Sequence, residues 1–271
     1  MKLDLSGHRS YCYTGGRPLA PERPTVVFIH GAGHDHSVWS LQTRYFVSHG
    51  WNVLATDLPG HGSSDGPALA IIEALADWVL ALVAGVGCRR VMLAGHSMGS
   101  LIALEATARA PDLVSRLALL GASFPMPVAA PLLDATQNAR DRAHGMINQW
   151  SYAPRSQLGA GSIPGINLTA LNERLMQRQA PGVLHRDMSA CNAYAAGFES
   201  AARVRCPVLF VSAELDRMTP VKALAPLAQA LGSAESVRQA VLPGAGHAMM
   251  VEAPGAVLDA LWNFARADTS L

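Results

Sequence analysis

The pentapeptide Gly95-His96-Ser97-Met98-Gly99 places a serine between two glycines in the pattern G-x-S-x-G. It directly follows the apolar run Val91–Ala94 and opens a segment of helical composition, Met98–Arg109. A sharp turn from strand to helix would hold this serine in a strained backbone, and it requires glycine two positions before and after it. Because the free N–H groups at a helix N-terminus favour negative charge, we predict that Ser97 is a nucleophile.

Asp216 and His247 complete a candidate set for nucleophilic catalysis. Asp216 lies just past the apolar run Pro207–Ser212, and His247 lies in the loop after a second such run, Ser236–Leu242. Open α/β sheets place their ligands at the edge where parallel strands end. We therefore predict that His247 takes the proton of the serine hydroxyl and that Asp216 orients the imidazole.

The choice of the acid has one nearby rival, Glu214. The loop after the apolar run Ser115–Leu120 reads Gly121-Ala122-Ser123 and holds no carboxylate, which removes the other expected position. A purely structural alternative is that Asp216 caps a helix that begins near Pro220.

A second small-residue loop, His30-Gly31-Ala32-Gly33, follows the first long apolar run. Small residues let the backbone approach a ligand closely, so the N–H groups of Ala32 and Met98 are predicted to form a two-donor oxyanion hole. The spacing does not fit the phosphate-binding pattern G-x-G-x-x-G, because no third glycine follows Gly31 and Gly33 at the required position.

Neither a metal nor an organic cofactor is expected. His34, Asp35 and His36 form a short run on one loop but lack a well-spaced further ligand, so a solvated loop is the preferred interpretation. The four cysteines have no C-x-x-C spacing and are expected to be reduced and mostly buried: Cys12, Cys88, Cys191 and Cys206.

Short apolar runs alternate with helical segments in the parts of the chain that must position these residues. The predicted strands are 25–30, 51–56, 90–94, 115–120, 207–212 and 236–242, and the predicted helices between them are 37–48 (with Ser37 as N-cap), 68–84, 98–109, 220–231 and 254–267. This order predicts an α/β fold with a mostly parallel sheet that is covered by helices on both faces. Residues 3–5 and 9–14 are expected to add an antiparallel hairpin at one edge.

The alternation stops between residues 124 and 203, where helical segments around 131–150, 168–179 and 183–196 are separated by a Gly/Pro-rich stretch, 158–165. We interpret residues 1–123 and 204–271 as one core domain and residues 124–203 as an inserted helical cap, because neither flank completes a sheet alone. The cap is expected to act as a lid over the Ser97 edge and to set the acyl specificity.

The order Ser97, Asp216, His247, with the HGAG loop upstream and the helical insertion, resembles the α/β-hydrolase superfamily over nearly the whole chain. The resemblance implies the α/β-hydrolase fold and assigns a structural role to the turn Asp57–Ser64. The cap around Asp187–Asn192 is more loosely similar to those of 3-oxoadipate enol-lactonase-like and BioH-like esterases. Ser100 departs from many relatives, which carry a second glycine there, but it does not alter the chemistry.

The substrate is less well defined by the sequence. Pocket candidates beside the predicted loops and in the cap are His30, Gly31, Trp39, His96, Trp150 and Met249. An apolar pocket would favour a small to medium uncharged ester or lactone. The cap arginines could instead select a carboxylate: Arg140, Arg142, Arg155, Arg174, Arg178 and Arg186.

These features predict a carboxylic ester or lactone hydrolase, with a C–C bond hydrolase or lyase acting on diketone-type substrates as the alternative and a non-catalytic receptor as the third possibility.

The chain has 271 residues, of which 50% are hydrophobic and 15% charged, and its net charge of +1 gives no indication of nucleic-acid binding. The run Val79–Cys88 is too short to span a bilayer, and no signal-like start is visible, so a cytoplasmic location is expected. The oligomeric state is left open.

Overall fold

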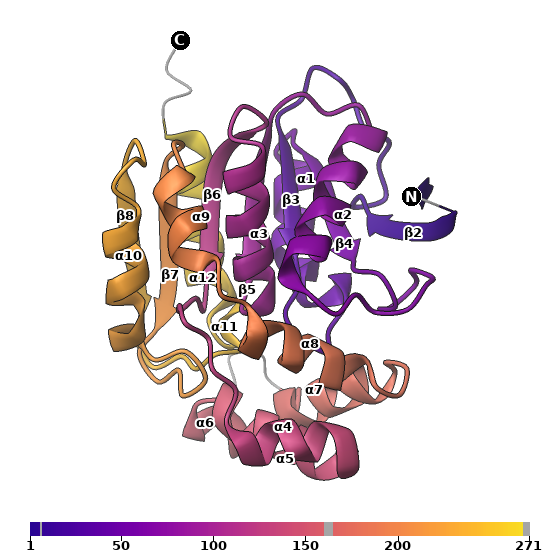
Figure 1. Cartoon of the computed structure of the whole chain (residues 1–271), viewed down its shortest axis with the longest axis vertical. Coiled ribbons are helices and arrows are strands. Elements are labelled where there is room, and N and C mark those ends of the chain that lie inside the picture. The colour runs from indigo at the N-terminus through magenta and orange to yellow at the C-terminus, as the bar shows by residue number, and fades with distance from the viewer. Residues whose placement is uncertain (6, 160–164, 268–271) are drawn as a thin grey trace.

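The computed structural model describes residues 1–5, 7–159 and 165–267, and within them a single mixed sheet carries the fold (Figure 1). The strands are β1 (Lys2–Leu5), β2 (His8–Tyr13), β3 (Thr25–Ile29), β4 (Asn52–Asp57), β5 (Val91–His96), β6 (Val114–Leu120), β7 (Val208–Ala213) and β8 (Val237–Leu242). Their spatial order is β1-β2-β4-β3-β5-β6-β7-β8. The pairs β1–β2 and β2–β4 are antiparallel and the others are parallel, which confirms both the predicted α/β class and the edge hairpin.

The helices are η1 (His36–Trp39), α1 (Ser40–Ser48), α2 (Ile72–Gly85), α3 (Met98–Arg109), α4 (Ala130–Asn138), α5 (Arg140–Ser151), α6 (Pro154–Gln157), α7 (Leu168–Gln177), α8 (Val183–Ala193), α9 (Gly197–Arg203), η2 (Val221–Leu224), α10 (Ala225–Ala230), α11 (Met249–Glu252) and α12 (Pro254–Arg266). Alternate residues of each central strand enter different cores. Val27 and Ile29 of β3 pack with α2, α3 and α10, whereas Val26 and Phe28 pack with α1 and α12 on the other face. Burial on both faces explains why these strands are almost continuously apolar.

The helix boundaries differ from the expected ones where polar contacts or backbone breaks intervene. The expected helix 131–150 is divided into α4 and α5 at Ala139, which has an extended φ of −151°. The expected helix 37–48 starts as the 3₁₀ turn η1, and Asp35 rather than Ser37 is its N-cap, because the Asp35 carboxylate accepts from the Ser37 N–H. Helix α2 begins only at Ile72, and α9 was not expected.

Helices α4 to α8 gather at one end of the sheet, where α11 also lies (Figure 1). Helices α4, α5, α7 and α8 share a small apolar cluster: Leu132, Ala135, Ala143, Ile147, Met176, Leu184 and Met188. Helix α9, in contrast, packs on α3, and its Ala201 belongs to the main core. Most of the Gly/Pro-rich stretch, residues 160–164, lies outside the described residues.

None of the helices in the described part of the chain combines the length and the hydropathy that crossing a membrane would require.

Candidate active site

Ser97 occupies a strained turn between β5 and α3. Its backbone has φ 54° and ψ −120°, and it is the non-glycine residue with positive φ among those described. A Cβ atom added to Gly95 would collide with the carbonyl group of Gly99, and one added to Gly99 would collide with the carbonyl group of Ile29. Glycine is therefore required at both positions, as the sequence pattern predicts. A strained residue at a helix N-terminus is a strong indication of function.

The imidazole of His247 is oriented by Asp216. The distance from His247 Nδ1 to Asp216 Oδ2 is 2.7 Å, and the two side chains are 6% and 0% exposed. Since a carboxylate only accepts, Nδ1 carries the proton and Nε2 is left as the base. Glu214, the rival acid, is exposed and accepts instead from the backbone N–H of Gly244.

Asp216 is itself held by the loop that follows it. Its Oδ1 accepts from the backbone N–H groups of Met218 and Thr219, each at 2.8 Å, and its Oδ2 accepts from the Thr219 hydroxyl at 2.8 Å. Burial alone would raise the pKa of Asp216, but the neighbouring His247 and these hydrogen bonds outweigh burial and lower it. The carboxylate is thus kept ionised. Thr219 was not singled out from the sequence, and nothing in its spacing distinguishes it from other threonines.

His96, the residue before the serine, forms a hydrogen bond to the backbone of His247. Its Nε2–H donates to the His247 carbonyl oxygen at 2.9 Å, and the two ring centroids are 4.6 Å apart. Its Nδ1 is buried without a hydrogen-bond partner among the described residues. Burial, followed by the charges of His247 and His34, lowers the pKa of His96 well below its ordinary value, so this ring is neutral.

The loop His30–Gly33 lies against the serine turn. A Cβ added to Gly31 would be 3.2 Å from both His96 Nδ1 and Ser97 Cβ, so the absence of a side chain permits this close approach. His30 itself is fully buried, accepts from the Leu58 N–H at Nε2 and contacts the Gly31 carbonyl at Nδ1, which fixes the start of the loop. Ala32 and Ser97 line one cavity. The oxyanion hole formed by the N–H groups of Ala32 and Met98 stays a prediction.

A cap residue that sequence reasoning assigned no role, Asp187, fixes this loop from the other side. Its Oδ2 accepts from the backbone N–H of Gly33 at 2.8 Å and contacts His61 Nε2 at 2.9 Å, while Oδ1 is buried without a partner among the described residues. His61 Nδ1 faces the carbonyl oxygen of Pro59 at 3.0 Å. Both partners of the His61 ring are acceptors, so the ring is doubly protonated and forms a buried ion pair with Asp187. Burial is the largest single effect and lowers the pKa of His61, but Asp187, together with the Pro59 carbonyl group and Asp57, outweighs burial and raises it.

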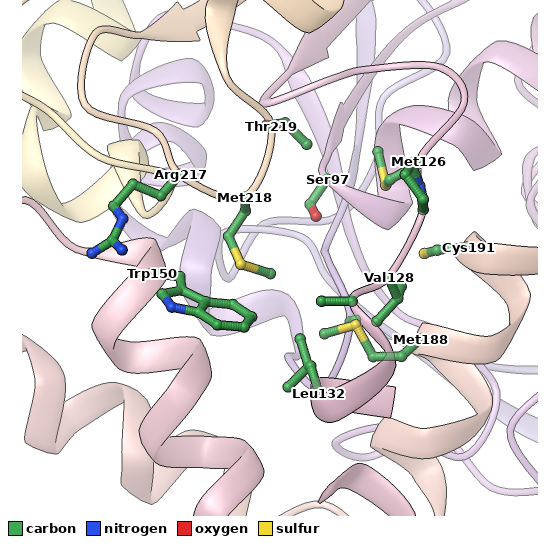
Figure 2. A pocket seen from close by; sticks show the side chains of 13 residues that line it. Ser97, Met126, Val128, Leu132, Trp150, Met188, Cys191, Arg217, Met218 and Thr219 are labelled. Atoms are coloured by element: carbon green, nitrogen blue, oxygen red, sulfur yellow. The ribbon is translucent and has the colours of Figure 1, made fainter. Parts of the chain in front are cut away.

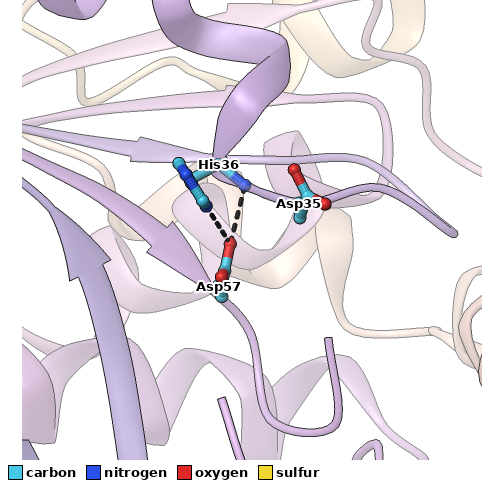
Figure 3. Close-up of side chains that lie close together, drawn as sticks. All are labelled: Asp35, His36 and Asp57. Carbon is cyan, nitrogen blue, oxygen red and sulfur yellow. Dashed lines mark hydrogen bonds and ion pairs between the residues drawn. The ribbon is translucent and has the colours of Figure 1, made fainter. Parts of the chain in front are cut away.

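The histidine and aspartate residues of the first loop are already engaged by protein groups. His36 Nδ1 contacts Asp57 Oδ1 at 2.7 Å (Figure 3), and Asp35 accepts from Ser37 and pairs with Arg178. The donor atoms of Asp35, His36 and Asp57 lie within 4.8 Å of one another, as a metal site would require. These hydrogen bonds account for the buried carboxylates without an ion, so the geometry gives no independent support for a metal at this position.

Two cavities border the candidate catalytic residues. The first, of about 170 Å³, contains Ser97 and has a largely apolar lining: Ala32, Met126, Pro127, Val128, Ala129, Leu132, Trp150, Met188, Cys191, Arg217, Met218 and Thr219. Figure 2 shows the Ser97 hydroxyl facing the space between Met218 and Val128, and the Arg217 side chain extending away from it. The second, of about 480 Å³, contains His34, His96 and His247.

The predicted pocket residues separate into two groups. Trp150 lines the first cavity and His96 the second. Trp39 and Met249 do not line either cavity: both are fully buried in the core, where Trp39 stacks on Phe28 with 4.9 Å between ring centroids. His30 is also buried in a structural role. An apolar residue near a strand-end loop can pack inward as well as toward a pocket, and the sequence does not distinguish the two.

Several cap arginines have structural partners rather than open positions. Arg140 donates to the backbone carbonyl groups of Met176, Gln177 and Gln179 near the end of α7. Arg186 donates to the Ala68 carbonyl oxygen, whereas Arg174 lines the second cavity.

The chain is similar to known hydrolases in both sequence and structure. A model of the alpha/beta hydrolase family matches residues 26–260. The chain is 37% identical over 132 residues to the (E)-2-((N-methylformamido)methylene)succinate hydrolase of Acinetobacter baylyi, covering 47% of each protein. It is 35% identical over 104 residues to a putative esterase/lipase of Haemophilus influenzae, covering 38% of this chain and 36% of that protein. The matches thus span about half or less of these curated relatives.

Solved structures match over almost the full length. The enol-lactonase from Burkholderia xenovorans LB400 has a TM-score of 0.84 at 21% identity, covering 97% of this chain and 99% of that one. Est816, described as an N-acyl homoserine lactone degrading enzyme, has a TM-score of 0.81 at 22% identity, covering 97% and 100%. At these identities the likeness establishes the fold.

Proposed function

We propose that this chain, which belongs to the alpha/beta hydrolase family, is a serine hydrolase that cleaves small carboxylic esters or lactones through an acyl-enzyme. The observation that carries the proposal is the 2.7 Å hydrogen bond between His247 Nδ1 and Asp216 Oδ2, because it leaves His247 Nε2 free to act as a base. The strained backbone of Ser97 and the largely apolar cavity that contains it support the same assignment.

In the proposed reaction, the Ser97 oxygen attacks the carbonyl carbon while His247 Nε2 takes the hydroxyl proton. The N–H groups of Ala32 and Met98 stabilise the negative oxygen of the tetrahedral intermediate. His247 then passes the proton to the leaving oxygen, and water, activated by the same imidazole, releases the acid. No step in this sequence uses a metal or an organic cofactor.

Covalent labelling tests the proposal. A fluorophosphonate probe should modify Ser97 alone in the folded protein, as peptide mapping by mass spectrometry would show. Ser97→Ala should abolish both the label and the hydrolysis of p-nitrophenyl acetate. A label elsewhere, or none on folded protein, would argue for a non-catalytic receptor instead.

A second candidate bond is an amide. The relative from Acinetobacter baylyi is named for a substrate that contains a formamide and a succinate, and it is 37% identical over 132 residues. Arg217 lines the first cavity, and Arg174 and Arg178 line the second, so these cations border the spaces that a carboxylate could enter. A substrate panel that includes esters, lactones, that substituted succinate and a vinylogous diketone would separate ester, amide and C–C bond cleavage.

The cap and the cellular location remain part of the proposal. We infer that α4 to α8 act as a lid, because Trp150, Met188 and Leu132 of these helices line the Ser97 cavity. We also place the protein in a reducing compartment such as the cytoplasm, in keeping with its four unpaired cysteines.

A further inference from the structure

The two cavities share no lining residue, and both border the candidate catalytic residues. Three short segments each contribute neighbouring residues to both cavities. Ser97 and Trp150 line the first cavity, whereas His96, Ser151 and Tyr152, the residues beside them, line the second. On the loop after β3, Ala32 lines the first cavity and His34 the second. The end of α5, the serine turn and the loop after β3 thus border both cavities.

Ser97 and His247 line different cavities, and this difference indicates where the two halves of an ester would lie. Ser97 and Ala32 belong to the first cavity and His247 to the second. In acyl transfer the serine oxygen first bonds to the carbonyl carbon to give the tetrahedral intermediate, and His247 then gives its proton to the leaving oxygen as the bond between that oxygen and the carbon breaks. The leaving group must therefore lie on the His247 side, and the acyl group on the side of Ser97 and the oxyanion donors.

The cavities also differ in size. The acyl-side cavity has about 170 Å³, which is below the roughly 300–1,000 Å³ of most small-molecule sites. The His247-side cavity has about 480 Å³, and aliphatic residues from α7, η1 and α11 dominate its wall, among them Val38, Leu168, Leu171, Leu175 and Met250. Leu171 is 55% exposed, so this cavity opens to solvent along α7.

We infer that the protein prefers esters with a short acyl group and an extended apolar alcohol, the alcohol lying in the cavity between α7 and the core. This inference rests on the proposed function and specifies its substrate class. It differs from the expectation that the cap selects mainly for acyl length, because the larger apolar space lies on the leaving-group side.

Two ester series test the assignment, with hydrolysis followed in a pH-stat. Along acetyl esters of ethanol, butanol, hexanol and octanol, kcat/KM should rise, by up to about fourfold for each methylene that is buried. Along ethyl esters of acetic, butyric, hexanoic and octanoic acid, kcat/KM should fall by about tenfold or more once the acyl chain outgrows the first cavity. The opposite pair of slopes would overturn the inference while leaving the hydrolase proposal intact.

Matched variants test whether each cavity determines one of the two trends in kcat/KM. Leu171→Trp should narrow the His247-side cavity and flatten the alcohol series without changing the acyl series. Val128→Ala, on the other side, should widen the first cavity and extend the tolerated acyl length. Leu158→Trp is the control, since Leu158 is 86% exposed on the same cap and lines neither cavity.

The possible outcomes distinguish a failure of the alcohol-cavity inference from a failure of the proposed hydrolase function. If Leu171→Trp lowered both series equally, or no more than the control did, the assignment of the alcohol to this cavity would be wrong. If the fluorophosphonate labelled Ser97 but no ester were hydrolysed, the inference would be wrong. Ser97 would then be a nucleophile that acts on a bond other than an ester. Failure of labelling would overturn the proposed function as well.

Discussion

Asp187 of α8 accepts a hydrogen bond from the backbone N–H of Gly33, 2.8 Å away, on the loop that follows β3. The two residues are 154 positions apart in the chain, so the cap directly fixes the loop that carries the proposed oxyanion donor Ala32. The same Asp187 oxygen pairs with His61 of the core, and both side chains are almost fully buried, 1% and 0% exposed.

Asp187→Ala should therefore impair both stability and catalysis. It leaves the buried His61 cation unpaired, which costs about 3–5 kcal/mol in comparable buried pairs, and it releases the Gly33 N–H. Chemical denaturation should show the lower free energy of unfolding, and kcat should fall more than KM rises. Arg9→Ala is the control, because it breaks an ion pair, with Asp65, whose two side chains are 54% and 47% exposed, so the pair contributes only about 0–1 kcal/mol. Equal effects of the two variants on kcat would contradict the assigned role of Asp187.

The His61–Asp187 pair also predicts a pH dependence of stability. The pKa of His61 is raised in the folded protein above its ordinary value of 6.5. A raised histidine pKa adds stability that is fully present below the unfolded-state value and is lost as the pH rises through the folded-state value. The difference in unfolding free energy between the native protein and Asp187→Asn should accordingly be largest below pH 6.5 and shrink at more alkaline pH. A difference that grew with pH would show that His61 is not the cation of this pair.

Asp216→Asn should lower kcat much more than Glu214→Gln. An amide that replaces the Asp216 carboxylate would present an N–H to His247 Nδ1 and favour the wrong tautomer, a change that costs about 10⁴-fold in a serine protease. Glu214 contacts only the Gly244 N–H among its described hydrogen bonds. Steady-state kinetics on p-nitrophenyl acetate would measure both, and the reverse order of severity would make Glu214 the acid.

Thr219 should act through Asp216. Thr219→Val removes the hydroxyl that donates to Asp216 Oδ2 at 2.8 Å and lies 3.2 Å from His247 Nδ1. Since hydrogen bonds to charged groups contribute about 1.5–3 kcal/mol, kcat/KM should fall by about tenfold or more. Thr219→Ser retains the hydroxyl and should recover most of the rate. A serine variant as slow as the valine variant would indicate a packing role for the methyl group.

The serine turn could be predicted from the sequence because local chemistry specifies it. The glycines at 95 and 99 follow from close contacts with backbone carbonyl groups, and these contacts leave a pattern in adjacent residues. The strand-end positions of Asp216 and His247 predicted that these side chains meet, and the structure places them 2.7 Å apart, while their catalytic roles stay predictions. Alternating apolar runs likewise predicted the parallel sheet, since a strand buried on both faces has little room for polar residues.

The contacts between cap and core could not be predicted in this way. Asp187, His61 and Gly33 meet only after the cap has folded over the sheet, and no spacing in the chain encodes that meeting. Trp39 shows the same limit for apolar residues. Its position beside a site loop suggested a pocket, but its ring stacks on Phe28 in the core, because hydrophobicity alone does not specify which cavity a side chain fills.

Deletion of the cap tests which of its helices only cover the active site and which also stabilise the core. Tyr194, just after α8, donates to Glu105 of α3 at 2.6 Å, and Ala190 and Cys191 of α8 pack in the main core. Removing residues 127–196 should therefore expose core surface and leave Glu105 without its Tyr194 donor.

Replacing only residues 130–181 by a Gly/Ser linker retains α8, and with it the hydrogen bond from Gly33 to Asp187. This shorter deletion should unfold at a distinctly higher temperature than the longer one, and its Ser97 should still react with a fluorophosphonate. Its rates on the acetyl esters should become independent of alcohol length, because α7 supplies one wall of the larger cavity. If both deletions melted at the same temperature, α8 would contribute no more to the core than the rest of the cap. Retention of the native alcohol profile by the shorter deletion would place alcohol selection in the core residues around His34 and Met250.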